Sequence, residues 1–384
     1  MEYRLDELFE LQMGKTPSRD NKDYWNSGSN KWVSIADLSK CGKYIQETKE
    51  CLSDKAIEES GINQIPENTV IMSFKLSIGK TAITVEPMYS NEAIMSFIDK
   101  RKVELIPDYI YYMFLKKDWD VGTNKAVMGK TLNKATLSQT KVTIHDIQQQ
   151  KQIVKILDKV TGIIAARKAE LDELEHLVKA RFVEMFGDPM SNSMGWHCLL
   201  LTEVCEAIFG GGTPSKSHPE YFTGTIPWIS PKDMKNSVIS DSIDHITEDA
   251  IVNSTTNLIP INSVLMVIRS GILKHTLPVA INSVLVTINQ DMKAFVPNSA
   301  VTPEYLMYYF KARELDVLSG VRGVTADNID FKAFQTRMVI VPPIELQNQF
   351  SAFVAQTDKS KVVIQKSLDE TQLLFDSLMQ EFFG

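Results

Sequence analysis

The sequence contains one long internal repeat with a period of about 197 residues. The matched motifs are the Thr-Pro-Ser of residues 16–18 and 213–215, the Trp-Val-Ser of 32–34 and Trp-Ile-Ser of 228–230, the Pro-Asp-Tyr of 107–109 and Pro-Glu-Tyr of 303–305, and the Glu-Met-Phe-Gly of 184–187 and Glu-Phe-Phe-Gly of 381–384. Solenoid repeats are far shorter. The repeat therefore predicts a duplicated domain, and the divergence between motifs predicts one scaffold with two different surfaces.

Each copy is long enough to bury its own core, because the chain has 384 residues. Runs of β-branched and apolar residues predict strands at 31–35, 69–74 and 81–85 in the first copy and at 226–229, 263–269 and 283–288 in the second. Helical stretches follow at 109–117 and 305–313. Each copy is thus expected to form an α/β domain.

A long amphipathic helix ends each copy. Apolar positions within 148–186, and within the equivalent C-terminal segment, step by alternating fours and threes, which is the heptad pattern of coiled coils. A helix over 148–186 would span roughly 55–60 Å, longer than a small domain is wide. The two helices are therefore expected to pack on each other through Ile153, Leu157, Val160, Ile164, Leu171, Leu174, Val178, Phe350, Val354, Ile364, Leu368, Phe375 and Leu378.

These patterns predict an α+β fold class: two pseudo-symmetric α/β domains separated by two long helices that pack as an antiparallel coiled coil. The predicted segments are a first domain at 1–146, a central helix at 147–188, a second domain at 189–341 and a C-terminal helix at 342–384.

Sequence motifs of common enzymes do not appear. The glycine-rich run at 210–217 has Ser215 where a phosphate-binding loop requires glycine before its lysine. The Pro-Pro pair at 342–343 lacks the Asn or Asp and the aromatic residue that an adenine methyltransferase places around it, and no dinucleotide fingerprint, nucleophile elbow or His-Glu-x-x-His occurs. We therefore expect no catalytic residues. An enzyme with an unrecognised centre, and a coiled-coil interaction scaffold without DNA binding, remain alternatives.

Loops rich in cations and hydroxyls are the candidates for binding. Residues 73–80 and 268–275 lie between predicted strands, where arginine can read guanine and lysine or serine can contact phosphates. A solvated turn is the alternative for any single lysine, and the net charge of −7 does not by itself indicate DNA. The candidate DNA-binding residues are Lys15, Thr16, Ser18, Lys75, Ser77, Lys80, Lys130, Thr213, Ser215, Lys216, Arg269, Ser270, Lys274 and Arg322.

The four cysteines form no Cys-x-x-Cys pair, and no zinc-finger spacing occurs, so neither a metal site nor a disulfide framework is expected. The charged N-terminus lacks the apolar segment of a secretory signal, and no run of 18 apolar residues occurs. A cytoplasmic protein without membrane contact is expected.

Three segments together resemble the specificity (S) subunit of type I restriction–modification systems. They are the Gly-Gly-Thr-Pro-Ser loop at 211–215, the aromatic and Ile-Pro-Trp-Ile-Ser segment at 221–230, and the Val-Ile-Val-Pro-Pro-Ile-Glu-Leu-Gln segment at 339–347. The first copy departs from this pattern. Its segment 144–150 lacks both prolines, and its loop 13–18 has one glycine fewer.

The resemblance implies that two target-recognition domains read the two halves of an asymmetric, bipartite site in double-stranded DNA. It implies that the helices set the spacer between the halves and dock two methyltransferase (M) subunits, and it leaves restriction (R) subunits open as further partners. The chain itself would bind no cofactor, whereas S-adenosylmethionine and ATP with Mg²⁺ would belong to the partner subunits.

Overall fold

The structure is a computed structural model that describes all residues except 76, 120–123, 127–128 and 322–326. Over residues 120–131 it describes no side chains. The chain divides into two compact units. The first comprises Met1–Arg167 and Ser367–Gly384, and the second comprises Lys168–Lys366. Each unit thus holds one α/β domain and part of both long helices. The four segments drawn from the sequence remain a prediction, because this division groups residues by contact and not by function.

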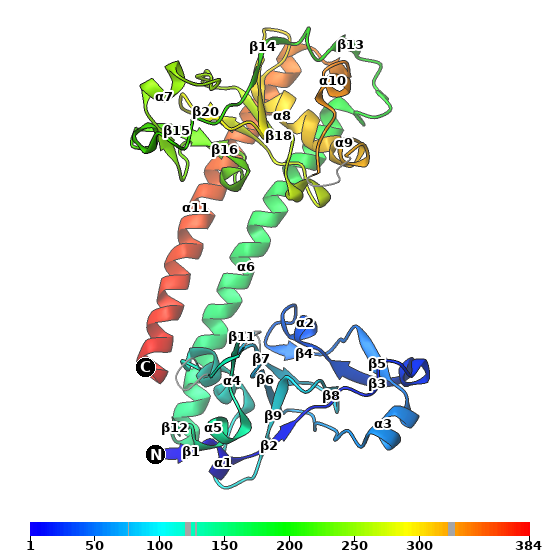
Figure 1. Cartoon of the computed structure of the whole chain (residues 1–384), viewed down its shortest axis with the longest axis vertical. Coiled ribbons are helices and arrows are strands. Elements are labelled where there is room, and N and C mark those ends of the chain that lie inside the picture. The colour runs from blue at the N-terminus through cyan, green and yellow to red at the C-terminus, as the bar shows by residue number, and fades with distance from the viewer. Residues whose placement is uncertain (76, 120–123, 127–128, 322–326) are drawn as a thin grey trace. The chain divides into compact units, whose positions relative to one another are not determined.

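The first unit is built on a five-stranded sheet with the order β2-β9-β6-β7-β4 (Figure 1). Its strands are β2 (Phe9–Met13), β9 (Ile94–Asp99), β6 (Val70–Ser73), β7 (Thr81–Thr84) and β4 (Tyr44–Ile45). A three-stranded sheet joins β5 (Glu50–Leu52), β3 (Trp25–Val33) and β8 (Tyr89–Ser90), and β1 (Glu2–Arg4) pairs with β12 (Lys141–Thr143). The remaining short elements are α1 (Leu5–Leu8), the 3-10 turn η1 (Lys22–Tyr24), α2 (Ile35–Leu38), α3 (Asp54–Ser60), α5 (Lys134–Gln139), β10 (Asn124–Ala126) and β11 (Gly129–Thr131).

The second unit repeats this topology. Its five-stranded sheet has the order β14 (Cys205–Gly210), β21 (Met292–Pro297), β18 (Val264–Val267), β19 (Val279–Asn282) and β16 (Val238–Ile239). A three-stranded sheet joins β17 (His245–Ile246), β15 (Ile226–Ile229) and β20 (Thr287–Ile288), and β13 (His197–Leu200) pairs with β22 (Met338–Val341). Short helices are α7 (Glu248–Val252), α9 (Glu314–Ser319), α10 (Phe331–Phe334) and the 3-10 turn η4 (Gly271–Lys274).

Even the register is repeated. Val70 of β6 lies opposite Ile83 and Phe97, and Val264 of β18 lies opposite Ile281 and Phe295. Of the strand predicted at 283–288, only Thr287–Ile288 forms, as β20. The Asn282 amide donates hydrogen bonds to the carbonyls of Pro260 (2.7 Å) and Val284 (2.8 Å), which ends β19 and turns the chain before β20 begins.

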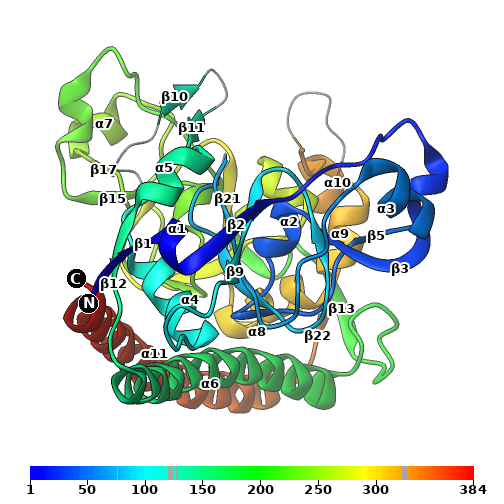
Figure 2. The ribbon, with the colours of Figure 1, turned by 90° about the horizontal axis from the view of Figure 1, so that it is seen from below.

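One helix in each unit covers the sheet. Helix α4 (Pro107–Lys116) lies against β6 and β7, and α8 (Pro303–Ala312) lies against β18, β19 and β21. In the first unit, residues of the sheet, of α4 and of the long helices share one buried cluster, so α4 is sandwiched between the sheet and the helices (Figure 2).

The long helices α6 (Ile147–Phe186) and α11 (Ile344–Phe383) have 40 residues each. In the first unit the early part of α6 shares a core with Phe375 and Leu378 of α11, and in the second unit Val178 of α6 shares a core with Phe350 and Val354. The start of one helix thus packs beside the end of the other, which makes the pair antiparallel, as expected. Of the predicted packing residues, Ile153, Leu157, Val160, Ile164, Val178, Phe350, Val354 and Leu368 are buried, and Leu171, Leu174, Ile364, Phe375 and Leu378 are half-buried.

A buried glutamine fastens the first turn of each long helix to its domain. Gln347 donates to the carbonyls of Pro342 (2.9 Å) and Ala300 (3.0 Å) and accepts from the Thr302 amide (2.8 Å). Gln150 makes the same three kinds of bond, with His145, Glu104 and Ile106. The glutamine therefore makes the same three hydrogen bonds in the first copy, which lacks the two prolines that precede it in the second.

Gly162 lies in the interior of α6, is exposed, and has open space where a Cβ would be added. We expect Gly162→Ala to raise the free energy of unfolding by about 1 kcal/mol, because alanine loses less backbone entropy in a helix. A higher urea midpoint with an unchanged slope would agree with this, and a lower midpoint would contradict it.

Candidate nucleic-acid interface

The Thr-Pro-Ser loop follows the first strand of each five-stranded sheet, and a glycine lets it pass close to a neighbouring turn. A Cβ at Gly14 would lie 2.2 Å from the Asn91 carbonyl oxygen, and one at Gly211 would lie 1.8 Å from that of Asn289. Neither approach leaves room for a side chain. These glycines therefore hold the loop against the turn that precedes β9 or β21.

The repeated tryptophan fastens the same loop from the other side. The indole N–H of Trp32 donates to the Lys15 carbonyl (3.0 Å), and that of Trp228 donates to the Gly212 carbonyl (3.0 Å). The tryptophan and the Thr-Pro-Ser motifs, which lie apart in the sequence, are thus joined by a hydrogen bond in each domain. Each bond uses a backbone carbonyl of the loop.

The turn before β9 or β21 is the second part of the surface. The Thr16 hydroxyl bonds to Glu92 in the first unit, and the Thr213 hydroxyl bonds to Gln290 in the second. The same position therefore carries a carboxylate in one unit and an amide in the other.

The segment after β6 or β18 is the third part. The Phe74 amide donates to the Ala93 carbonyl (3.0 Å), and the Ile268 amide donates to the Asp291 carbonyl (2.8 Å). Because these bonds correspond, Lys75 and Arg269 occupy equivalent positions. The loop after β2 or β14, the turn before β9 or β21 and the segment after β6 or β18 therefore meet at the same strand ends of each five-stranded sheet. Together they form the candidate interface.

In the second unit, Arg269, Lys274, Ser215 and Lys216 are exposed, and Thr213 and Ser270 are half-buried. The Arg269 Nε lies 2.6 Å from an Asp291 oxygen, and the Lys274 amine lies 3.8 Å from Asp327. Arg322 lies outside the described residues.

Arg269 also lines an open depression of about 790 Å³. Two lysines that the sequence did not single out, Lys293 and Lys332, line it as well, with the amides of Gln290 and Asn328. The Lys293 amine lies 4.5 Å from the centre of the Phe331 ring. Cations beside amides are the groups that contact phosphates and base edges. The lysines escaped prediction because they are distant from Arg269 in the sequence: Lys293 lies on β21, which pairs with β18, and Lys332 lies on α10.

In the first unit, Lys15, Ser18 and Ser77 are exposed, and Thr16, Lys75 and Lys80 are half-buried. The Lys15 amine donates to the Ser60 carbonyl and the Lys80 amine to the Ser39 hydroxyl, whereas the Lys75 amine lies 5.2 Å from the Phe74 ring. Lys130 belongs to β11, but its side chain is outside the described part of the chain.

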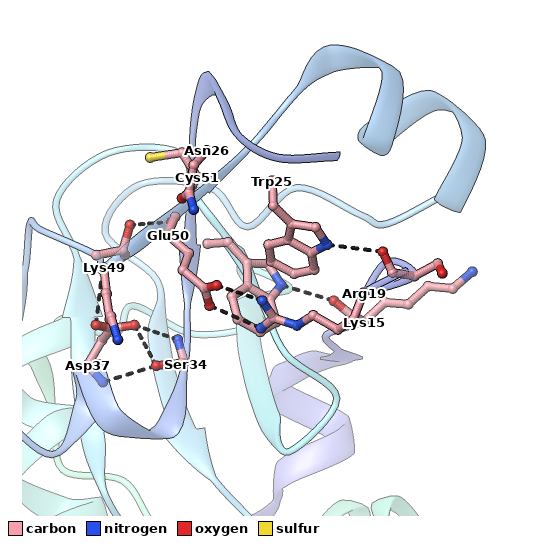
Figure 3. Close-up of polar contacts among 12 residues, drawn as sticks. Lys15, Arg19, Trp25, Asn26, Ser34, Asp37, Lys49, Glu50 and Cys51 are labelled. Atoms are coloured by element: carbon pink, nitrogen blue, oxygen red, sulfur yellow. Dashed lines mark hydrogen bonds and ion pairs between the residues drawn. The ribbon is translucent and has the colours of Figure 1, made fainter. Parts of the chain in front are cut away.

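Arg19, one residue beyond the Thr-Pro-Ser loop, stacks on the aromatic pair of the first unit (Figure 3). Its guanidinium carbon lies 3.6 Å from the centre of the Trp25 ring and 5.0 Å from that of Trp32. Both terminal nitrogens bond to the Glu50 carboxylate, at 2.6 and 3.0 Å. A planar guanidinium favours this combination of stacking and two-point pairing. The sequence showed the aromatic repeat but not Glu50, which comes from another strand.

Ion pairs tie each domain to its helices. In the second unit, Lys361 of α11 lies 2.8 Å from Glu175 of α6, and Lys311 of α8 lies 3.9 Å from it. Burial raises the pKa of Glu175, but the hydrogen bond from Lys361 and the charges of the nearby lysines outweigh it and hold the pKa below its usual range. In the first unit Lys43 pairs with Asp108 of α4 and with Asp158 of α6.

Among the described residues, none of the helices combines the length and the hydrophobicity needed to span a lipid bilayer. No group of three or more His, Cys, Asp or Glu side chains there is arranged to hold a metal ion.

The family model described as "Type I restriction modification DNA specificity domain" matches residues 1–176 and 194–371. The EcoR124I/EcoR124II specificity subunit of Escherichia coli is 36% identical over 216 residues, which are 54% of this chain and 52% of that protein. The chain thus spans about half the length of this relative. The MjaIX specificity subunit of Methanocaldococcus jannaschii is 22% identical over 99% of this chain and 92% of that protein.

Solved structures share the fold. The S subunit of a type I system from M. genitalium has a TM-score of 0.58 at 12% identity, covering 100% of this chain and 96% of that one. A chain from a study of assembly and conformational transition in the type I system has a TM-score of 0.60 at 15% identity, covering 100% and 97%.

Proposed function

This chain belongs to the family of type I restriction–modification DNA specificity domains, and we propose that its two unlike units read the two halves of an asymmetric DNA target. DNA sequence specificity is the function that the family assigns. The observation that supports two different half-sites is the contrast at equivalent positions of the two interfaces. Lys75, Glu92 and Ala93 of the first unit correspond to Arg269, Gln290 and Asp291 of the second.

This contrast has chemical consequences. Arginine presents two donors in a fixed fork, which matches the O6 and N7 acceptors of guanine, whereas lysine is a single charged point. An amide both donates and accepts hydrogen bonds, whereas a carboxylate only accepts. One scaffold with different groups at the same places therefore favours different bases in the two half-sites.

We propose that methyl transfer and cleavage belong to partner subunits, and that this chain supplies recognition and assembly without a catalytic group. The relatives are named specificity subunits of restriction enzymes, which supports this division of labour. On this proposal, S-adenosylmethionine binds to two methyltransferase subunits, and ATP with Mg²⁺ binds to restriction subunits. The complex would work in the cytoplasm.

The outer face of α11 offers apolar surface for such partners. Val362 and Val363, both in the second unit, are each 69% exposed. Exposed aliphatic side chains on a helix are suited to packing against helices of another subunit. This surface supports the docking of methyltransferase subunits.

Exchange of residues 189–341 for the equivalent domain of another specificity subunit tests the proposal. The hybrid chain, assembled with methyltransferase subunits, is expected to methylate sites in which one half has changed completely and the other is unaltered. Sequencing of methylated adenines across a genome would give both halves. A change in both halves would refute independent reading, and a lack of DNA affinity in the unaltered complex would favour the interaction-scaffold alternative.

A further inference from the structure

We propose that Asp291 orients the Arg269 guanidinium to read a guanine, so that Asp291 determines one base of the half-site read by the second unit. The inference rests on the proposed function of this surface. Asp291 is a positioning residue, and Arg269 is the residue that would contact the base.

Arg269 is bound to Asp291 through both its backbone and its side chain. The Arg269 amide donates to the Asp291 carbonyl (3.2 Å), and the Arg269 Nε donates to the Asp291 carboxylate (2.6 Å). The first bond sets where the side chain begins, and the second sets the direction in which the guanidinium points. Arg269 also forms a backbone bridge with Asn328, which holds it from the opposite side.

The carboxylate that orients Arg269 is itself fixed. The buried Asn289 side chain accepts a hydrogen bond from the Asp291 amide (3.1 Å) and donates one to the second Asp291 oxygen (3.3 Å). One oxygen of Asp291 thus faces Asn289 and the other faces Arg269. A guanidinium held in this way has already lost rotamer freedom that it would otherwise lose on binding DNA.

The orientation leaves the useful end of Arg269 open. Its Nε is taken by Asp291, while within the described part of the chain its two terminal nitrogens have no hydrogen bond or ion pair. These nitrogens form the fork that pairs with guanine O6 and N7. The Arg269 side chain is 48% exposed and the Asp291 side chain 23%, so the cation is the more accessible of the two.

Two positions in the first unit show the contrast. Lys75 corresponds to Arg269, and Ala93 corresponds to Asp291, so the lysine has no carboxylate at the equivalent place. Arg19 has a carboxylate partner, but Glu50 occupies both of its terminal nitrogens (Figure 3). The two arginines therefore differ in their terminal nitrogens. Those of Arg269 remain available to a base, whereas those of Arg19 bond to Glu50 within its own domain.

The test uses the full chain assembled with methyltransferase subunits. Binding is measured on duplexes that keep the first half-site and carry each base in turn at every position of the second. We expect Asp291→Ala to reduce the preference for guanine about tenfold at one position, and Arg269→Ala to remove that preference at the same position. Asp291→Ala added to Arg269→Ala should then have little further effect on base preference. Asp291→Asn, which keeps an acceptor for Nε, should retain part of it.

Asp327→Ala is the matched control, because it removes a carboxylate from the same face beside Lys274. It is expected to raise affinity for all sequences alike. An equal loss of affinity for every base in Asp291→Ala, or effects of Asp291→Ala and Arg269→Ala at different positions, would overturn the inference. If the unaltered complex showed no base preference in the second half-site, the proposed function would fail instead. The thermal unfolding midpoint of each variant reports whether its second unit is folded.

Discussion

Phe350→Ala is expected to lower the free energy of unfolding of the second unit by about 3–5 kcal/mol. Phe350 is fully buried, and its ring centre lies 5.5 Å from those of Phe182 and Phe186 and 5.4 Å from that of Tyr308. Both long helices and α8 contribute to this aromatic cluster. Truncation would therefore remove buried area and leave a cavity where three helices meet.

Denaturation of the full chain in guanidinium chloride, followed by tryptophan fluorescence, would measure the effect. Leu373→Ala is a suitable control because it shortens a side chain of the same helix that is 70% exposed, and it should cost no more than about 0.5 kcal/mol. A loss below about 1 kcal/mol in Phe350→Ala would mean that the cluster does not hold the helices together.

Gly211→Val is expected to weaken binding to the second half-site by about 3 kcal/mol, or about 150-fold. The first atom of the new side chain would overlap the backbone of Asn289, and backbone cannot turn aside as a flexible side chain can. The loop would have to leave the turn before β21, which would separate Thr213 from Gln290.

Titration of duplexes that vary only in the second half-site would measure this loss. Gly271→Ala is the matched glycine change on the same face, because nothing lies within 4 Å of its added Cβ. It should leave thermal stability within about 0.5 kcal/mol of the unaltered chain. If Gly211→Val bound both half-sites normally, the loop would not depend on its close approach to the turn.

The sequence predicted the architecture well because the architecture depends on patterns that repeat. Paired motifs predicted two similar domains, and the heptad pattern predicted the long antiparallel helices, as the shared register and the cores around Leu157 and Val178 confirm. The strand expected at 283–288 is confined to Thr287–Ile288, because the Asn282 side chain bonds to the Pro260 and Val284 carbonyls and turns the chain before it.

The candidate site was less predictable. The loops were found because they carry glycine, hydroxyl and cationic residues between strands. Glu50, Asp291 and Lys293 were missed because each reaches the interface only through strand pairing, and nothing near it in sequence marks it. Such partners decide whether the terminal nitrogens of an arginine are available to a base. The positions of the cations in the sequence therefore did not predict which of them could contact DNA.

The tryptophan bond to the Thr-Pro-Ser loop has a consequence for retargeting. The loop offers only main-chain carbonyls, of Lys15 or Gly212, to the indole that anchors it. Those carbonyls are present whatever the side chains are. Substitutions in the loop can therefore change its outward-facing side chains and keep the hydrogen bond from tryptophan. A library that randomises the outward positions while preserving tryptophan and glycine would therefore yield many folded chains with new preferences.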